Sequence, residues 1–241
     1  MNNLIDRSIR GLSFDVKLYK QPMLFIALML FGLYLLNIAT GDPARPRTVY
    51  YLSEMGMFPL VIIVTLLMYQ REIGGGGMEI ISTYPISLRV MVVRKWVVAI
   101  LISTLFSLGW MIAYLLKFGE IITTHFLWSG ETPIKSKPIG IIPLLLQTLP
   151  AYVLLASLTV TGIIIFRKIY GGLILGFSVW VLDTISGGSV FNSWTLYTAY
   201  LGEEDSFPAN RIVLLIGSML LLAFSVWLVG KRERWISVEE E

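Results

Sequence analysis

The segment WVVAILISTLFSLGWMIAYLL, residues Trp96–Leu116, contains no charged residue. A helix rises about 1.5 Å per residue, so it needs roughly 20 mainly apolar residues to cross the ~30 Å hydrocarbon core of a bilayer. This segment is therefore predicted to cross a membrane. The sequence contains five similar apolar runs, two before this segment and three after it. The six predicted spans are about residues 23–39, 55–69, 96–116, 139–166, 171–185 and 212–230.

The composition agrees with a membrane protein. Of the 241 residues, 56% are apolar and only 15% are charged, whereas a soluble domain usually has about a quarter charged residues. The chain has no cysteine, which excludes disulfide scaffolds and Cys-ligated metal sites, and its one histidine leaves little room for a His-based site. We expect an all-α membrane domain over residues 1–241, with no metal or cofactor on this chain and no nucleic-acid partner.

Two features of the predicted spans concern their lengths. The second and fifth runs are short, and we expect the flanks Val49–Leu52 and Ile169–Tyr170 to extend them. The fourth run is long and contains Pro143 and Pro150, which predict a kink or an entry turn at the membrane interface.

The basic residues predict the orientation. With six crossings, both termini and the loops after spans two and four share one side of the membrane. Thirteen of the 19 Lys and Arg residues fall on that side. Because cytoplasmic loops carry the excess of Lys and Arg, we expect a multi-pass protein of the plasma membrane with both termini in the cytoplasm.

The chain before the first span has a helical pattern. Apolar residues recur every three or four positions from Ile5 to Tyr19, which places them on one helical face. Basic residues lie off that face: Arg7, Arg10, Lys17 and Lys20. We expect residues 1–22 to form an amphipathic helix in the headgroup region. The alternative is an ordinary basic flank of the first span.

The loop between spans two and three is the most informative stretch. Four glycines, Gly74–Gly77, favour a sharp turn. They are not a phosphate-binding loop, because neither Lys-Ser nor Lys-Thr follows them and no strand precedes them. Met78–Tyr84 is long enough for about two helical turns, Pro85 disfavours helix at the residue before it, and Ser87 is a natural N-cap. A short docking helix is predicted here. The alternative is a solvated loop.

This loop resembles that of ATP-binding-cassette type 2 permeases. The family often shows a Glu-Arg or similar pair, then Gly-Thr, a Glu before two aliphatic residues, a Pro-Ile-Ser-like turn, and a Lys opening the next helix. The similar residues here are Arg71-Glu72, Gly76-Gly77, Glu79-Ile80-Ile81, Pro85-Ile86-Ser87 and Lys95. The chain departs from the pattern where Gly76-Gly77 replaces Gly-Thr. Six spans and the amphipathic N-terminal helix also resemble the family.

The resemblance implies a dimer of permeases, identical or paralogous, above two ATPase subunits that hold ATP and Mg. The short helix would be the coupling helix, seated in a groove of the ATPase. Glu72 and Glu79 would pair with basic groups of the ATPase or of the connector helix (residues 1–22), and Lys95 would anchor the start of span three. The residues assigned to this contact are Arg71, Glu72, Glu79, Ile80, Pro85, Lys95, Arg167 and Lys168, and those of the connector helix are Arg7, Arg10 and Lys17. The sequence itself contains no P-loop, so ATP-driven action needs a second polypeptide.

Asp183 is the one acid predicted to lie inside a span. A carboxylate in a membrane is costly, which favours a functional role. Alternatively it lies at the wet interface, just before Ser186-Gly187-Gly188-Ser189, with Thr184 and Ser186 as hydrogen-bond partners. The aromatic residues that follow fit an interfacial belt or short re-entrant helices. In the resembled family this region is a re-entrant lid near the exit path.

The leading functional prediction is the permease subunit of an exporter for an amphipathic drug, peptide or lipid-like substrate, with walls chiefly from spans two and five. A secondary transporter or channel would need more ionisable groups than Asp183 inside the spans. An intramembrane enzyme would need paired catalytic groups, and no such motif is present in the sequence. A non-transporting sensor subunit of the same kind of complex remains an alternative.

Overall fold

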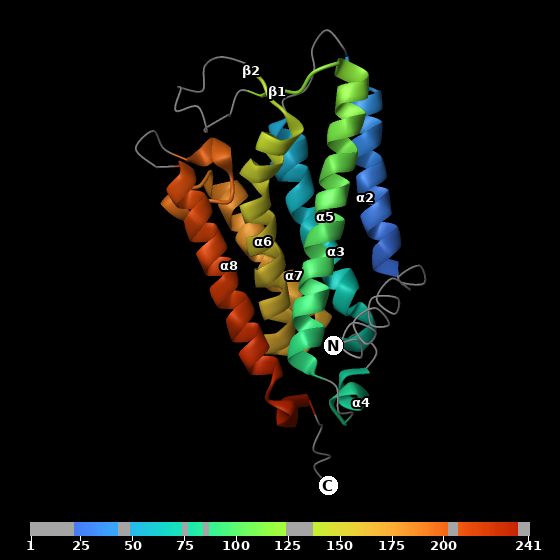
Figure 1. Cartoon of the computed structure of the whole chain (residues 1–241), viewed down its shortest axis with the longest axis vertical. Coiled ribbons are helices and arrows are strands. Elements are labelled where there is room, and N and C mark those ends of the chain that lie inside the picture. Colours follow the sequence, from blue (N-terminus) through green and yellow to red (C-terminus); the bar gives the residue numbers. More distant parts are fainter. Residues whose placement is uncertain are drawn as a thin grey trace, which may run out of the picture.

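Six helices dominate the computed structural model, which describes residues 22–42, 49–73, 77–83, 87–123, 137–201 and 207–235. All six are long and apolar enough to cross a membrane, which confirms the predicted number of spans. They run side by side along the long axis of the molecule (Figure 1). The spans are α2 (Pro22–Ala39), η1 with α3 (Tyr51–Gly56 and Met57–Ile73), α5 (Leu88–Phe118), α6 (Ile141–Phe166), α7 (Ile169–Ser186) and α8 (Phe207–Val229).

The helices are mostly longer than the apolar runs. As expected, the second and fifth spans gain length from their flanks, because the π-helix η1 continues into α3 and α7 begins at Ile169. Span three begins at Leu88, where the Ser87 side chain accepts the Val90 N–H and caps the helix as predicted. Helix α6 continues through Pro150.

The short elements lie at the two ends of the bundle (Figure 1). Helix α4 (Gly77–Thr83) and the 3-10 helix η5 (Arg232–Trp235) lie at one end, which we call the α4 end. The opposite end holds an antiparallel pair of two-residue strands, β1 (Ile122–Thr123) and β2 (Lys137–Pro138), with Ile122 opposite Pro138. The short 3-10 helices η3 (Asn192–Trp194) and η4 (Thr198–Tyr200) connect α7 to α8.

Helices α3 and α6 form the centre of the bundle. Within their most apolar windows, 78% and 72% of residues are buried, compared with 11–33% in the other four spans. Helix α3 contacts α2, α5, α6 and α7, and this accounts for its apolar residues on every side. The outer helices expose apolar side chains, as expected for surfaces that face lipid.

Glycines bring α6 and α7 into backbone contact. A Cβ placed on Gly162 of α6 would lie 2.3 Å from the carbonyl oxygen of Gly171 on α7, and one on Gly171 would lie 2.5 Å from the Gly162 oxygen. Small residues allow such close approach between membrane helices. The contact lies beside the tight turn at Arg167 and Lys168, where Arg167 has a left-handed backbone with φ 55°.

We expect Gly162→Ala to destabilise the bundle by about 1–3 kcal/mol, because the added methyl overlaps the backbone of α7. Gly32→Ala on α2 is the matched control, since a Cβ at Gly32 meets nothing within 4 Å. The control should be neutral, or more stable by up to ~1 kcal/mol from helix propensity. Thermal unfolding of the detergent-purified chain measures both. Equal stability of the two variants would contradict the close packing.

Candidate functional site

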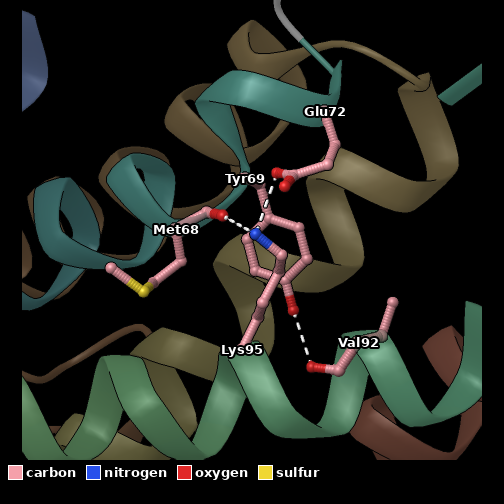
Figure 2. A network of polar contacts seen from close by, with 5 residues as sticks. All are labelled: Met68, Tyr69, Glu72, Val92 and Lys95. Carbon is pink, nitrogen blue, oxygen red and sulfur yellow. Dashed lines mark hydrogen bonds and ion pairs between the residues drawn. The ribbon is translucent and has the colours of Figure 1, made fainter. Parts of the chain in front are cut away.

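A buried ion pair joins the second and third spans near the α4 end. The Lys95 ammonium on α5 lies 2.8 Å from the Glu72 carboxylate on α3 and donates to the Met68 carbonyl at 2.6 Å (Figure 2). Both charged side chains are buried, with exposed fractions of 4% and 7%. The Tyr69 hydroxyl adds a hydrogen bond from α3 to the Val92 carbonyl at 2.9 Å. These contacts fix the two helices against each other next to the loop that connects them.

Helix α4 occupies the place of the predicted docking helix. It spans Gly77–Thr83, close to the predicted Met78–Tyr84. It packs on α3 and η5, and Arg232 of η5 donates to the Ser82 carbonyl at 3.3 Å. Met78 and Ser82 are buried. The helix is therefore held against the end of the bundle.

The structure places the other residues assigned to the ATPase contact as follows. Arg71 is exposed at the end of α3, and Arg167 and Lys168 are exposed between α6 and α7. Glu72 has its partner within the chain, and its contact with a second subunit stays a prediction. Some predicted features lie outside the described residues: the side chains of Glu79 and Ile80, all of Pro85, and the connector helix with Arg7, Arg10 and Lys17.

We expect Lys95→Met to destabilise the chain by about 3–5 kcal/mol, because Glu72 would remain as an unpaired buried charge. Lys117→Met is the control on the same helix, since Lys117 is exposed, and it should cost less than about 1 kcal/mol. Thermal unfolding in detergent measures both variants. The double variant Glu72→Leu with Lys95→Met should recover most of the loss. If the double variant recovers no stability, the unpaired Glu72 charge is not the cause of the loss in Lys95→Met.

A second group of buried polar residues lies where α7 ends. Asp183 is fully buried. Its two carboxylate oxygens each lie 3.0 Å from the Thr195 hydroxyl, and one accepts the Leu196 backbone N–H at 2.7 Å. The prediction that Thr184 and Ser186 would pair with this carboxylate was wrong. Both hydroxyls bind backbone carbonyls of α7 instead.

Glu54 is a second buried acid at this end, and the sequence analysis missed it. It lies on η1 with an exposed fraction of 1%. Its carboxylate accepts the Thr198 hydroxyl at 2.7 Å and the Thr198 backbone N–H at 3.0 Å. The second apolar run was taken to begin at Met55, one residue later. A signal was present, because Glu54 directly precedes a charge-free stretch that continues to Gln70.

The π-helix that carries Glu54 is supported by tyrosines from other spans. Tyr34 of α2 donates to the Gly56 carbonyl at 2.5 Å, and Tyr152 of α6 donates to the Ser53 carbonyl at 2.6 Å. The wide helical turn leaves such carbonyls in need of donors inside an apolar bundle. The tyrosines supply them and fix Glu54 at a defined depth.

Arg211 completes this group and was also missed, because the sixth apolar run was taken to begin at Ile212. It lies on α8, is 3% exposed, and donates through Nη1 to the Leu196 carbonyl at 3.2 Å. Its Nε and Nη2 have no hydrogen-bond partner among the described residues. The neighbouring Asn210 donates to the carbonyls of Ser193 and Thr195 at 2.8 and 3.1 Å.

These side chains hold one short stretch of chain, residues 193–198, which we call the capping segment. Glu54 from η1, Asp183 from α7, and Asn210 and Arg211 from α8 all bind its backbone or its threonines. Tyr197 within the segment also accepts the Trp180 indole N–H at 2.8 Å. Burial raises the pKa of the Tyr197 phenol to about 12. Gln147 of α6 also donates to the Thr198 hydroxyl, at 3.3 Å. The segment is thus fastened from four spans.

We expect Asp183→Ala to loosen the capping segment. The Leu196 N–H would lose a charged acceptor, and such hydrogen bonds contribute about 1.5–3 kcal/mol. Backbone amide exchange over residues 192–200 should therefore become about ten- to a hundredfold faster, as read by hydrogen–deuterium exchange with mass spectrometry. Ser189→Ala is the control, because Ser189 is exposed and its hydroxyl binds the nearby Ser186 carbonyl. Unchanged exchange in Asp183→Ala would show that the carboxylate does not fasten the segment.

Neither group of buried charges resembles a metal site. Among the described residues, no group of three or more His, Cys, Asp or Glu side chains could hold a metal ion. The buried charges instead bind one another, the backbone or threonine hydroxyls, and this suits mechanical fastening.

Comparison with protein-family models, curated proteins and solved structures found no significant match to this chain. The resemblance to type 2 permeases therefore rests on residues 71–95 and on the order of spans, and it stays a prediction.

Proposed function

We propose that this chain is the membrane-spanning subunit of an ATP-binding-cassette transporter, driven by a separate ATPase that holds ATP and Mg. The observation that carries the proposal is α4, a two-turn helix between the second and third spans that is braced against the end of the bundle. A rigid element in that place can receive a push from a subunit below and pass it to the spans.

The distribution of charge supports the orientation that this function needs. Most described Lys and Arg residues lie toward the α4 end: Arg71, Arg89, Arg94, Lys95, Arg167, Lys168, Lys231, Arg232 and Arg234. Those toward the opposite end are Lys117, Lys137 and Arg211. By the positive-inside rule, the α4 end would face the cytoplasm, where an ATPase subunit is found. The proposed location is the plasma membrane.

The contacts suggest how movement would cross the membrane. Helix α4 packs on α3, and α3 is fastened to α5 by Glu72 and Lys95. At its other end α3 continues from η1, where Glu54 holds Thr198 of the capping segment. A shift of α4 would therefore reach the opposite end through one nearly continuous helix. Alternating access of two facing permeases would then use this shift to open and close the outer end.

The exposed surfaces bear on the substrate. Of the two spans predicted to line the path, α3 is buried in the centre of its own bundle, and α7 leaves a larger apolar surface exposed. An apolar wall from α7 favours an amphipathic drug, peptide or lipid-like substrate, exported between two copies or paralogues of the chain.

A secondary transporter is the alternative that the structure strengthens. Glu54, Asp183 and Arg211 are three ionisable side chains buried in helices that are apolar enough to span a membrane. Such groups often mark ion pathways. Their observed hydrogen bonds go mainly to the capping segment, so we retain the ATP-driven permease as the leading proposal.

The experiment is purification of the full chain from its native host in mild detergent, with mass spectrometry of the proteins that accompany it. We expect an ATPase with Walker motifs in stoichiometric amount. Glu79→Lys should remove it, because the reversed charge lies on α4. Glu120→Lys is the matched control, since Glu120 is exposed at the opposite end of the bundle and its reversal should leave the complex intact.

Two results would count against the proposal. A chain that purifies without any ATPase, under conditions that preserve other membrane complexes, would contradict an ATP-driven permease. Equal loss of the ATPase in Glu79→Lys and Glu120→Lys would contradict a specific contact at α4.

A further inference from the structure

An apolar cavity of about 430 Å³ lies between α6, α7, α8 and the start of the capping segment. Its walls come mainly from leucines and valines of the three spans. Trp194 and Leu196 of the capping segment line it beside the start of α8, and Phe224 lines it farther along that helix. Every lining residue is aliphatic, aromatic or glycine.

The cavity exists because packing between α6 and α8 is locally incomplete. From Ala151 to Ile164, every residue of α6 is buried except Leu154 and Leu158, and these two line the cavity. Gly217 faces them from α8, and a Cβ added there would lie 3.8 Å from the nearest atom, Leu154 Cδ1. Gly217 thus leaves space open, in contrast to Gly162, whose missing side chain is replaced by backbone of α7.

The position of the opening determines what can enter. Leu220, Phe224 and Trp194 line the cavity and are also exposed, by 67%, 43% and 60%. Leu220 and Phe224 are exposed on α8, and exposed apolar residues on a spanning helix face the hydrocarbon of the bilayer. A cavity without polar partners does not hold water. The material at its opening is therefore lipid.

The length of the cavity matches one leaflet. Val213 and Phe224 both line it, and the 11 steps between them correspond to about 16 Å along α8 at ~1.5 Å per residue, close to half of the ~30 Å hydrocarbon core. Trp194 lies at the end nearest the membrane surface, a depth that tryptophan favours. An acyl chain that enters beside Trp194 and extends to Phe224 would fill the cavity.

We infer that this cavity binds one long acyl chain of a lipid from the leaflet that lies next to the capping segment. The inference goes beyond the proposed transport function, because it requires neither an ATPase nor a second copy of the chain. Leu196 of the capping segment, which lines the cavity, is held in place by Asp183 and Arg211. Asp183 accepts its backbone N–H, and Arg211 donates to its carbonyl. Because the lining is apolar, the cavity recognises the length of the acyl chain. A phospholipid or a free fatty acid can supply that acyl chain.

The test is native mass spectrometry of the full chain, purified and delipidated in detergent and then titrated with dipalmitoyl phosphatidylcholine or with palmitic acid. We expect saturable binding of one lipid per chain. Gly217→Leu should weaken this binding about tenfold or more, because the new side chain takes the space of buried methylenes. Gly32→Leu is the matched control, since Gly32 is exposed in a span and has nothing within 4 Å of its Cβ position. It should bind as the unchanged chain does.

The arms of the experiment separate the outcomes. Binding of both lipids would show that the acyl chain is what the cavity recognises. Binding of only one would show whether a phospholipid or a free fatty acid supplies that acyl chain. Equal binding by Gly217→Leu and Gly32→Leu would overturn the inference, and so would an unchanged chain that retains no lipid. Loss of self-association in Gly217→Leu without a change in lipid binding would assign the cavity to a contact between copies, which also overturns it.

A second measurement tests the inference without the Gly217→Leu variant, in case that variant fails to fold. The unchanged chain in lipid nanodiscs is crosslinked with a phosphatidylcholine that carries a diazirine in the middle of one acyl chain. Adducts should concentrate on α8 between Val213 and Phe224 and be reduced by excess palmitic acid. Adducts spread evenly over the exposed faces of all six spans would contradict a defined site.

Discussion

The structure depends on one constraint that a membrane imposes on the polar groups inside the bundle. Hydrocarbon offers no hydrogen-bond partners, so every polar group inside the bundle must be satisfied by the chain or by trapped water. Among the described residues, the buried Asp, Glu, Lys and Arg side chains occur in two places, each close to an end of the bundle. Lys95 with Glu72 fastens α5 to α3 at the α4 end, and Glu54, Asp183 and Arg211 fasten the capping segment at the other.

These buried charges specify geometry more than they add stability. A buried ion pair often contributes little relative to a well-packed apolar pair, whereas removal of one partner is costly. An apolar bundle could pack α3 against α5 in several registers, but the 2.8 Å contact between Lys95 and Glu72 permits one. In the same way, two carboxylates from different spans select one position for residues 193–198. Both groups therefore act as positioning devices at the ends of a single long element, η1 with α3.

The packing of α6 against α7 and α8 divides the molecule into a tightly packed region and a loosely packed region. Helices α6 and α7 touch at Gly162 and Gly171 near the α4 end. Toward the opposite end, residues of the capping segment occupy part of the space between α6, α7 and α8, and the cavity beside Gly217 remains. The tightly packed half suits the transmission of force, and the looser half suits movement and contact with lipid.

Much of the fold could be predicted from local patterns. Hydropathy located all six spans, and Pro85 with Ser87 located the start of α5, because apolar length and helix caps are properties of neighbouring residues. The polar site was largely missed. Glu54 and Arg211 each stand one residue before an apolar run, those that begin at Met55 and Ile212. Their partners cannot be read from spacing, since Glu54 binds Thr198, 144 residues away. For Asp183, the nearest hydroxyls in the sequence were the wrong ones.

The most direct test of the account is the side of the membrane that each end faces. The chain has no cysteine, so single-cysteine variants at the exposed positions Thr83 on α4 and Ser189 after α7 can be labelled cleanly. With a membrane-impermeant maleimide, Ser189→Cys should react in intact cells, and Thr83→Cys should react only after the membrane is permeabilised. Labelling of Thr83→Cys from outside intact cells would place α4 away from any cytoplasmic ATPase and contradict the proposed function.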